Sequence, residues 1–198
     1  MPDNEAFKDK ADPEEKRATK CLVAIKKQRQ ISSLDGLEWS LLREIKLLQE
    51  LKHENIVKLR DVFHNKNLIY FALEYGPIDL GKLIINKKEI MLEPQHIKCI
   101  VKQMLEGLDY LHSNWIMHRD LKPGNMIITA DGTLKLIDFN SAKIYGSPGR
   151  EHTATTTTIN YRSPEQLFAS MLYGPAIDIW SVGCIFAELH LRSYLFAG

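Results

Sequence analysis

118-HRDLKPGN-125 is the most informative stretch of this 198-residue sequence. It puts an aspartate, a lysine and an asparagine in one short segment, and a second acidic motif, 138-DFN-140, lies a little further on. Between the two motifs, the short apolar runs 126–129 and 134–137 flank the turn signal 130-ADG-132. This pattern predicts a β-hairpin with a polar motif at each end.

Towards the N-terminus, the sequence predicts a small unit of strands and one helix. Residues 21–26 form an apolar, β-branched run that indicates a buried strand ending on Lys26. Leucine and isoleucine recur at helical spacing over 38–51, which predicts an amphipathic helix carrying Glu44. The runs 56–59 and 68–75 are typical of strands, and the polar residues 64–67 predict the turn of an antiparallel hairpin.

Beyond Gly76-Pro77, which we interpret as the boundary of this unit, the chain turns helical. Pro94 opens a periodic apolar pattern that predicts a long helix ending near Asn114. A last helix is expected from Asp178 to about Leu191. That helix is apolar around most of its circumference and would need to be covered on all sides. Since the sequence ends at Gly198, we expect Trp180 and Phe186 to face water or a partner.

The composition excludes several classes of protein. With 44% hydrophobic and 26% charged residues, the chain can bury a core, and a net charge of +1 predicts no direct contact with nucleic acid or a membrane. The three cysteines are odd in number and far apart, which argues against disulfides and structural zinc. Residues 1–20 are highly charged, unlike a signal peptide, so we expect a disordered or frayed N-terminus and a nuclear or cytoplasmic protein.

Four motifs in order, 24-AIK-26, Glu44, 118-HRDLKPGN-125 and 138-DFN-140, resemble those of the eukaryotic protein kinases. The resemblance runs from about residue 21 to the C-terminus. It implies an α+β, bilobal fold without its first strands, truncated at both ends. We expect a partial N-lobe at 21–75 and an incomplete C-lobe at 76–198, with an activation segment at 138–165.

By this resemblance, the chain binds ATP and Mg²⁺. Phosphoryl transfer needs a cation on the phosphates, and Lys26, held by Glu44, would supply it. The alternative for Lys26 is a strand-end lysine that extends its ammonium group to water.

Four further residues of the two loops would carry the reaction. Asp138 and Asn125 would bind the metal ions, since magnesium prefers oxygen donors. Asp120 would orient the substrate hydroxyl and accept its proton, and Lys122 would stabilise the transferred phosphoryl group. The alternative is that these residues only form ordinary turns at the ends of the hairpin.

The resemblance also implies an adenosine pocket. Leu73 would be the gatekeeper, the backbone of Glu74 and Gly76 would bind adenine, Asp79 would approach the ribose, and the base would lie between Ala24 and Ile127. Leu73, Ala24 and Ile127 are equally well explained as core residues.

Four segments narrow the resemblance to the cyclin-dependent kinases, and to the branch that activates other such kinases and joins transcription factor H: 43–59, 146–150, 161–165 and 178–189. This implies a serine/threonine kinase of cell-cycle or transcription control, with protein substrates and a cyclin-type subunit on helix 38–51. The alternative for that helix is plain packing. Thr153 and Ser147 would be phosphorylated regulatory residues.

Three departures from the family pattern favour reduced activity. No glycine precedes Gly36, so the glycine-rich phosphate loop is missing, and the sequence ends 20 residues after Asp178. Asn140 replaces a glycine, and we expect it to adopt positive φ at some cost. We therefore expect poor protein phosphorylation by this chain alone. The competing hypotheses are a catalytically impaired, pseudokinase-like module that binds a cyclin and, more weakly supported, a fragment that binds RNA or phosphopeptides.

Overall fold

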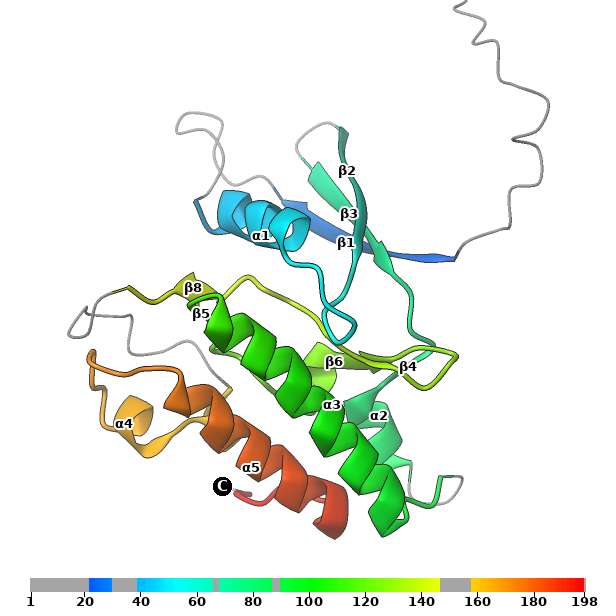
Figure 1. Cartoon of the computed structure of the whole chain (residues 1–198), viewed down its shortest axis with the longest axis vertical. Helices are drawn as coiled ribbons and strands as arrows, with labels where there is room; N and C mark the ends of the chain where they lie inside the picture. Colours follow the sequence, from blue (N-terminus) through cyan, green and yellow to red (C-terminus); the bar gives the residue numbers. More distant parts are fainter. Residues whose placement is uncertain (1–21, 30–38, 66–67, 87–89, 147–157, 198) are drawn as a thin grey trace, which may run out of the picture.

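The computed structural model describes residues 22–29, 39–65, 68–86, 90–146 and 158–197. A small sheet with one helix lies at one end of the molecule, and a larger helical part lies at the other (Figure 1). The predictions for residues 1–20, Ser147 and Thr153 fall outside the described residues.

The small part is an antiparallel sheet in the order β1–β3–β2 with helix α1 (Trp39–Glu50) beside it. Its strands are β1 (Val23–Arg29), β2 (Leu59–Asn65) and β3 (Leu68–Glu74). Strand β1 continues past Lys26, and its Val23 and Ile25 are exposed, so the expected buried strand ending on Lys26 is wrong. Helix α1 buries Leu41, Glu44, Leu47 and Leu48, which share one face because of their spacing. The predicted helix is therefore confirmed, with ends one residue inside those expected.

The expected antiparallel hairpin with the run 68–75 is confirmed, but the expected bounds of its first strand, 56–59, are wrong. Strand β2 begins only at Leu59 and runs through to Asn65, into the predicted turn. The backbone of residues 55–57 bonds elsewhere: Leu136 N donates to Asn55 O at 2.8 Å, and Val57 N donates to Leu136 O at 3.0 Å. The apolar run thus joins the two parts of the molecule instead of extending the small sheet.

The larger part contains the remaining elements: β4 (Ile78–Asp79), α2 (Leu80–Ile85), α3 (Pro94–Ser113), β5 (Ile116–Met117), η2 (Pro123–Asn125), β6 (Met126–Ile128), β7 (Leu134–Leu136), β8 (Lys143–Ile144), η3 (Ile159–Tyr161), α4 (Pro164–Leu167) and α5 (Ala176–Leu191). Strands β4, β6 and β7 form one sheet, and β5 pairs with β8. The predicted hairpin and both long helices are confirmed, although α5 begins two residues early.

Helices α3 and α5 lie side by side and pack against each other (Figure 1). Their buried apolar residues include Met104, Leu108, Leu111, Ile185 and Leu189. The outer face of α5 stays apolar: Trp180 is 39% and Phe186 45% exposed, as expected, and Trp180 stacks on Phe196. Within the described ranges, no helix combines the length and apolar character needed to cross a membrane.

Two helical glycines give a matched test of this packing. A Cβ on Gly183 of α5 would meet nothing within 4 Å, so Gly183→Ala should stabilise the fold by about 0.5–1 kcal/mol through helix propensity. A Cβ on Gly107 of α3 would lie 3.1 Å from both Cβ and O of Asn55, whose backbone is bonded to β7, so Gly107→Ala should destabilise. Urea unfolding of both variants measures this, and equal stabilisation would contradict the packing of α3 on residue 55.

Candidate functional site

Lys26 joins three elements at the junction of the two parts. Its Nζ lies 2.7 Å from Oε1 of Glu44 on α1 and 2.8 Å from Oδ1 of Asp138, which follows β7. The ammonium group also sits 5.8 Å from the centre of the Phe71 ring, its cross-strand partner. The structure thus brings together three residues that the sequence analysis took from separate motifs. It does not support the alternative of a lysine extended to water.

The two carboxyl groups beside Lys26 differ in depth, and their pKa values move in opposite directions. Glu44 is 1% exposed, and its burial raises its pKa despite the neighbouring ammonium. Asp138 is 33% exposed; burial acts to raise its pKa, but the hydrogen bond and charge of Lys26 outweigh this and hold the pKa below its usual range. Asp138 therefore stabilises the fold at neutral pH, and this contribution is lost as the pH falls through its lowered pKa.

Asp120 is the centre of a second cluster. Its Oδ2 lies 3.0 Å from Lys122 Nζ and accepts a 3.1 Å hydrogen bond from Asn125 Nδ2, which also donates to the Asp120 carbonyl at 2.8 Å. Its Oδ1 accepts from Thr158 N at 3.1 Å, and Lys122 Nζ donates to Thr158 Oγ1 at 3.0 Å. Thr158 was missed in the sequence because it is one of four consecutive threonines.

A buried aspartate holds the start of the 118–125 loop in place. Asp178 of α5 is 1% exposed and accepts hydrogen bonds from His118 N at 2.9 Å and Arg119 N at 2.8 Å. His112 Nε2 lies 3.0 Å from its Oδ2. From the sequence, Asp178 was expected to begin the last helix and the family-like segment 178–189, but no structural role was expected for its side chain. A carboxylate within an apolar helix nevertheless indicates a bonded, structural role.

The backbone at the start of the loop bends sharply. Arg119 has φ 68, in the left-handed region, and its side chain donates from Nε to Ser141 O at 2.7 Å. His118 Nε2 lies 3.0 Å from Ile137 O, so the 118–125 loop is tied to the segment around 138-DFN-140. The two motifs therefore form one connected unit.

Asn140 does not take the positive φ that we expected. Asp138 does instead, with φ 65, and Asn140 is absent from the described residues with positive φ. The reason is that the turn bends at the first position of the motif, so glycine is not needed at the third. The Oδ1 of Asn140 is buried and has no hydrogen-bond partner among the described residues.

The six residues expected around adenosine lie on β1, β3, β4 and β6 and on the segment between β3 and β4. Ala24 faces Leu73 across β1 and β3, and Glu74 ends β3. Asp79 pairs with Ile127 across β4 and β6. Gly76 closes the gap, because a Cβ there would lie only 2.9 Å from Ile127 Cβ.

The chain is similar to known protein kinases over most of its length. The profile described as "Protein kinase domain" matches residues 14–198. Cyclin-dependent kinase 7 of Dictyostelium discoideum is 48% identical over 181 residues, covering 89% of this chain and 50% of that protein. Cyclin-dependent kinase 7 of Caenorhabditis elegans is 49% identical, covering 89% of this chain and 54% of that protein. The chain thus spans about half the length of the curated relatives it matches.

A solved structure matches the fold. The structure of the CAK complex from Chaetomium thermophilum bound to ATP-γ-S contains a chain that superposes with a TM-score of 0.82 and 42% identity, covering 89% of this chain and 56% of that one. These matches confirm the family resemblance seen in the sequence and the expected α+β, bilobal fold.

The Lys26 cluster can be tested by removing its positive charge. In Lys26→Met we expect the pKa of both Glu44 and Asp138 to rise, because each carboxyl loses its counter-charge. Carbon-13 NMR titration of the carboxyl groups measures this. Lys27→Met, next along β1 and exposed, is the matched control and should leave both pKa values in place. An unchanged Asp138 in Lys26→Met would contradict the ion pair.

Asp178→Asn tests the support of the loop. The amide keeps the size of the side chain but turns an acceptor into a donor that faces a backbone N–H. We expect a loss of about 2–3 kcal/mol in unfolding free energy, with faster hydrogen exchange at residues 118 and 119. Asp109→Asn on the exposed face of α3 is the control. Equal stability of the two variants would show that Asp178 does not hold the loop.

Proposed function

The chain belongs to the protein kinase family, and from this premise we propose that it transfers the γ-phosphate of ATP to serine or threonine hydroxyls of proteins, as cyclin-dependent kinases do. The observation that carries the proposal is the presence of two clusters of charged and polar side chains, one around Lys26 and one around Asp120. Lys26 is held between Glu44 and Asp138, and Asp120 is held between Lys122, Asn125 and Thr158. One cluster suits phosphate binding, and the other suits activation of a hydroxyl.

The nucleotide would bind at the junction of the two parts. Adenine would lie between Ala24 and Ile127, bonded to the backbone of Glu74 and Gly76, with Leu73 behind it and Asp79 near the ribose. Lys26 would reach the α- and β-phosphates, and Glu44 would keep the ammonium group aimed at them.

The oxygen donors of the site fit magnesium. Asp138 offers a partly exposed carboxylate with a lowered pKa, and Asn125 uses its amide nitrogen for Asp120, which leaves its carbonyl oxygen as a donor. Both are hard ligands of the kind that Mg²⁺ prefers. When bound, the metal would neutralise charge on the phosphates.

Asp120 would act on the acceptor hydroxyl. Its carboxylate would accept the hydroxyl proton as the oxygen bonds to the γ-phosphorus and the bond to ADP breaks. Lys122, bonded to both Asp120 and Thr158, would stand beside the transferred group and offset its negative charge. Thr158, which is hydrogen-bonded to both residues, would hold the carboxylate of Asp120 and the ammonium group of Lys122 in fixed relative positions.

Helix α1, within the expected docking segment 38–51, would bind a cyclin-type subunit. Trp39 is 80% and Leu42 38% exposed on its outer side. The matched solved structure is described as a CAK complex, which supports a multi-subunit assembly. We further propose a role in cell-cycle or transcription control, in the nucleus or cytoplasm, without direct contact to nucleic acid or membrane. Thr153 and Ser147 remain predicted phosphorylation sites.

Magnesium-dependent binding of ATP is the first test. By isothermal calorimetry, ATP should bind more tightly with Mg²⁺ than without it, and Asp138→Ala should remove this difference. Asp109→Ala, an exposed carboxylate on α3, controls for the change in net charge. If both variants keep the metal dependence, the assignment of Asp138 is wrong.

Transfer of labelled phosphate to serine and threonine proteins is the second test. Asp120→Asn should lower the rate about 10²- to 10⁴-fold, because it removes the proton acceptor while keeping the side-chain size. The pseudokinase-like alternative predicts binding of a cyclin-type partner with no transfer by either protein. Transfer at equal rates by both would contradict the role of Asp120.

A further inference from the structure

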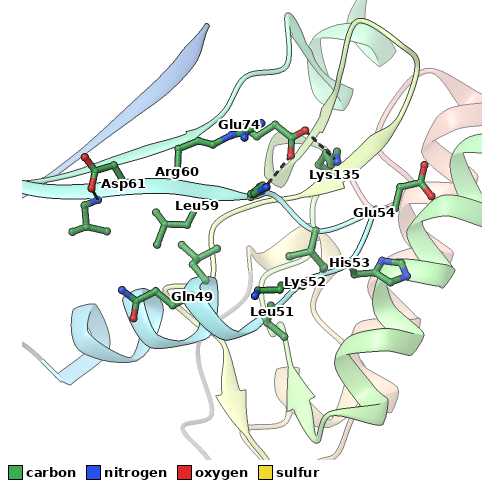
Figure 2. Close-up of a pocket in the computed structure, with 14 residues that line it drawn as sticks. Gln49, Leu51, Lys52, His53, Glu54, Leu59, Arg60, Asp61, Glu74 and Lys135 are labelled. Carbon is green, nitrogen blue, oxygen red and sulfur yellow. Dashed lines mark hydrogen bonds and ion pairs between the residues drawn. The ribbon is translucent and has the colours of Figure 1, made fainter. Parts of the chain in front are cut away.

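We propose that the chain has a second ligand site, separate from the nucleotide site, that binds a small amphipathic monoanion such as an aromatic carboxylate. The site is the α1–β2 cleft, between the C-terminal end of α1 and the start of β2 (Figure 2). The Glu74–Lys135 ion pair closes one side of it.

The cleft has the size and floor of a ligand site. Its volume is about 780 Å³, within the range of about 300–1,000 Å³ that is usual for small-molecule pockets. Five aliphatic side chains line it: Leu48, Leu51, Ile56, Leu59 and Val62. Leu48, Leu51 and Ile56 are buried. The floor is also rigid, because residues 55–57 are hydrogen-bonded to Leu136 of β7.

The rim of the cleft favours a negative ligand. Two of its three carboxylates already have partners. The Glu74 carboxylate lies 3.2 Å from Lys135 Nζ and accepts a hydrogen bond from Lys58 N at 3.3 Å. The Asp61 carboxylate accepts a hydrogen bond from Val62 N at 2.8 Å. Glu54 is exposed to solvent. Three cationic side chains of the rim have no hydrogen-bond or ion-pair partner in the described part of the chain: Lys52, Lys58 and Arg60.

One excess positive charge therefore remains after pairing. Lys52, Lys58 and Arg60 stand against Glu54 and Asp61, once Glu74 and Lys135 have neutralised each other. An apolar body would cover the aliphatic floor, and a single carboxylate would meet the cations of the rim. A dianion would exceed the single excess positive charge of the rim, and a neutral molecule would leave that charge without a counter-charge.

The site is distinct from the proposed nucleotide site. Its lining includes neither Lys26 nor Asp138. The two sites share Glu74 only, and they use different parts of it: the backbone is assigned to adenine, whereas the carboxylate faces Lys135 and the cleft. Binding in the cleft thus does not require the proposed function to be correct.

The test compares 2-naphthylacetate with its neutral amide, 2-naphthylacetamide, by NMR titration of the 198-residue chain. The carboxylate should shift the amide signals of residues 48–62 and 135 and bind about three- to tenfold more tightly than the amide, since two or three exposed charge contacts contribute. Saturating ATP should not displace it.

Two variants with the same net charge test whether the cations of the rim cause the preference for the carboxylate over the amide. Lys58→Glu should remove the preference for the carboxylate, whereas Lys98→Glu, on the exposed face of α3 and outside the cleft, should keep it. Four outcomes would overturn the proposal: no binding up to the solubility limit, equal binding of acid and amide, displacement by ATP, or shifts centred on the apolar surface around Trp180 and Phe196 instead of the cleft.

Discussion

The buried carboxylate of Asp178 fixes the start of the loop that carries half of the candidate site. Leaving Asp178 unpaired at 1% exposure would cost several kcal/mol, so the backbone around it must supply donors. It does so through the amides of His118 and Arg119, which places the start of the 118–125 loop against α5. The left-handed φ of Arg119 is tolerated because these bonds hold it. Asp120 and Asn125 take their positions from that anchor.

The junction between the two parts depends on polar contacts as well as on packing. The backbone of residues 55–57 is bonded to β7, and Lys26 reaches from β1 to carboxyl groups on α1 and after β7. Since Glu44 is deeply buried and Asp138 is partly open to water, the same ammonium group leaves one carboxyl with a raised pKa and the other with a lowered one. The exposed member is the one suited to bind a cation.

The segment at Glu74 separates two surfaces with different properties. On one side, Ala24 pairs with Leu73 across β1 and β3, and Gly76 lies close to Ile127; these are residues that we propose around adenine. On the other, the Glu74 carboxylate is tied to Lys135 beside an aliphatic cleft. The floor of this cleft includes Ile56, and the backbone on either side of it is fixed by hydrogen bonds to Leu136.

The sequence by itself placed the polar residues of the candidate site in short motifs and determined several local elements. In 118-HRDLKPGN-125, short spacing alone holds Asp120, Lys122 and Asn125 within one loop. Periodicity predicted α1 and α3, and the turn signal 130-ADG-132 between two apolar runs predicted the β6–β7 hairpin, since these elements depend on contacts between near neighbours. Only the tertiary structure decided the rest. Ile56 and Val57 have the pattern of a strand but bond to a distant hairpin, Asp178 and Thr158 act on a loop far away in sequence, and positive φ falls on Asp138 instead of Asn140. Such features follow from which partners the folded chain brings within hydrogen-bonding distance, and a local pattern carries no record of them.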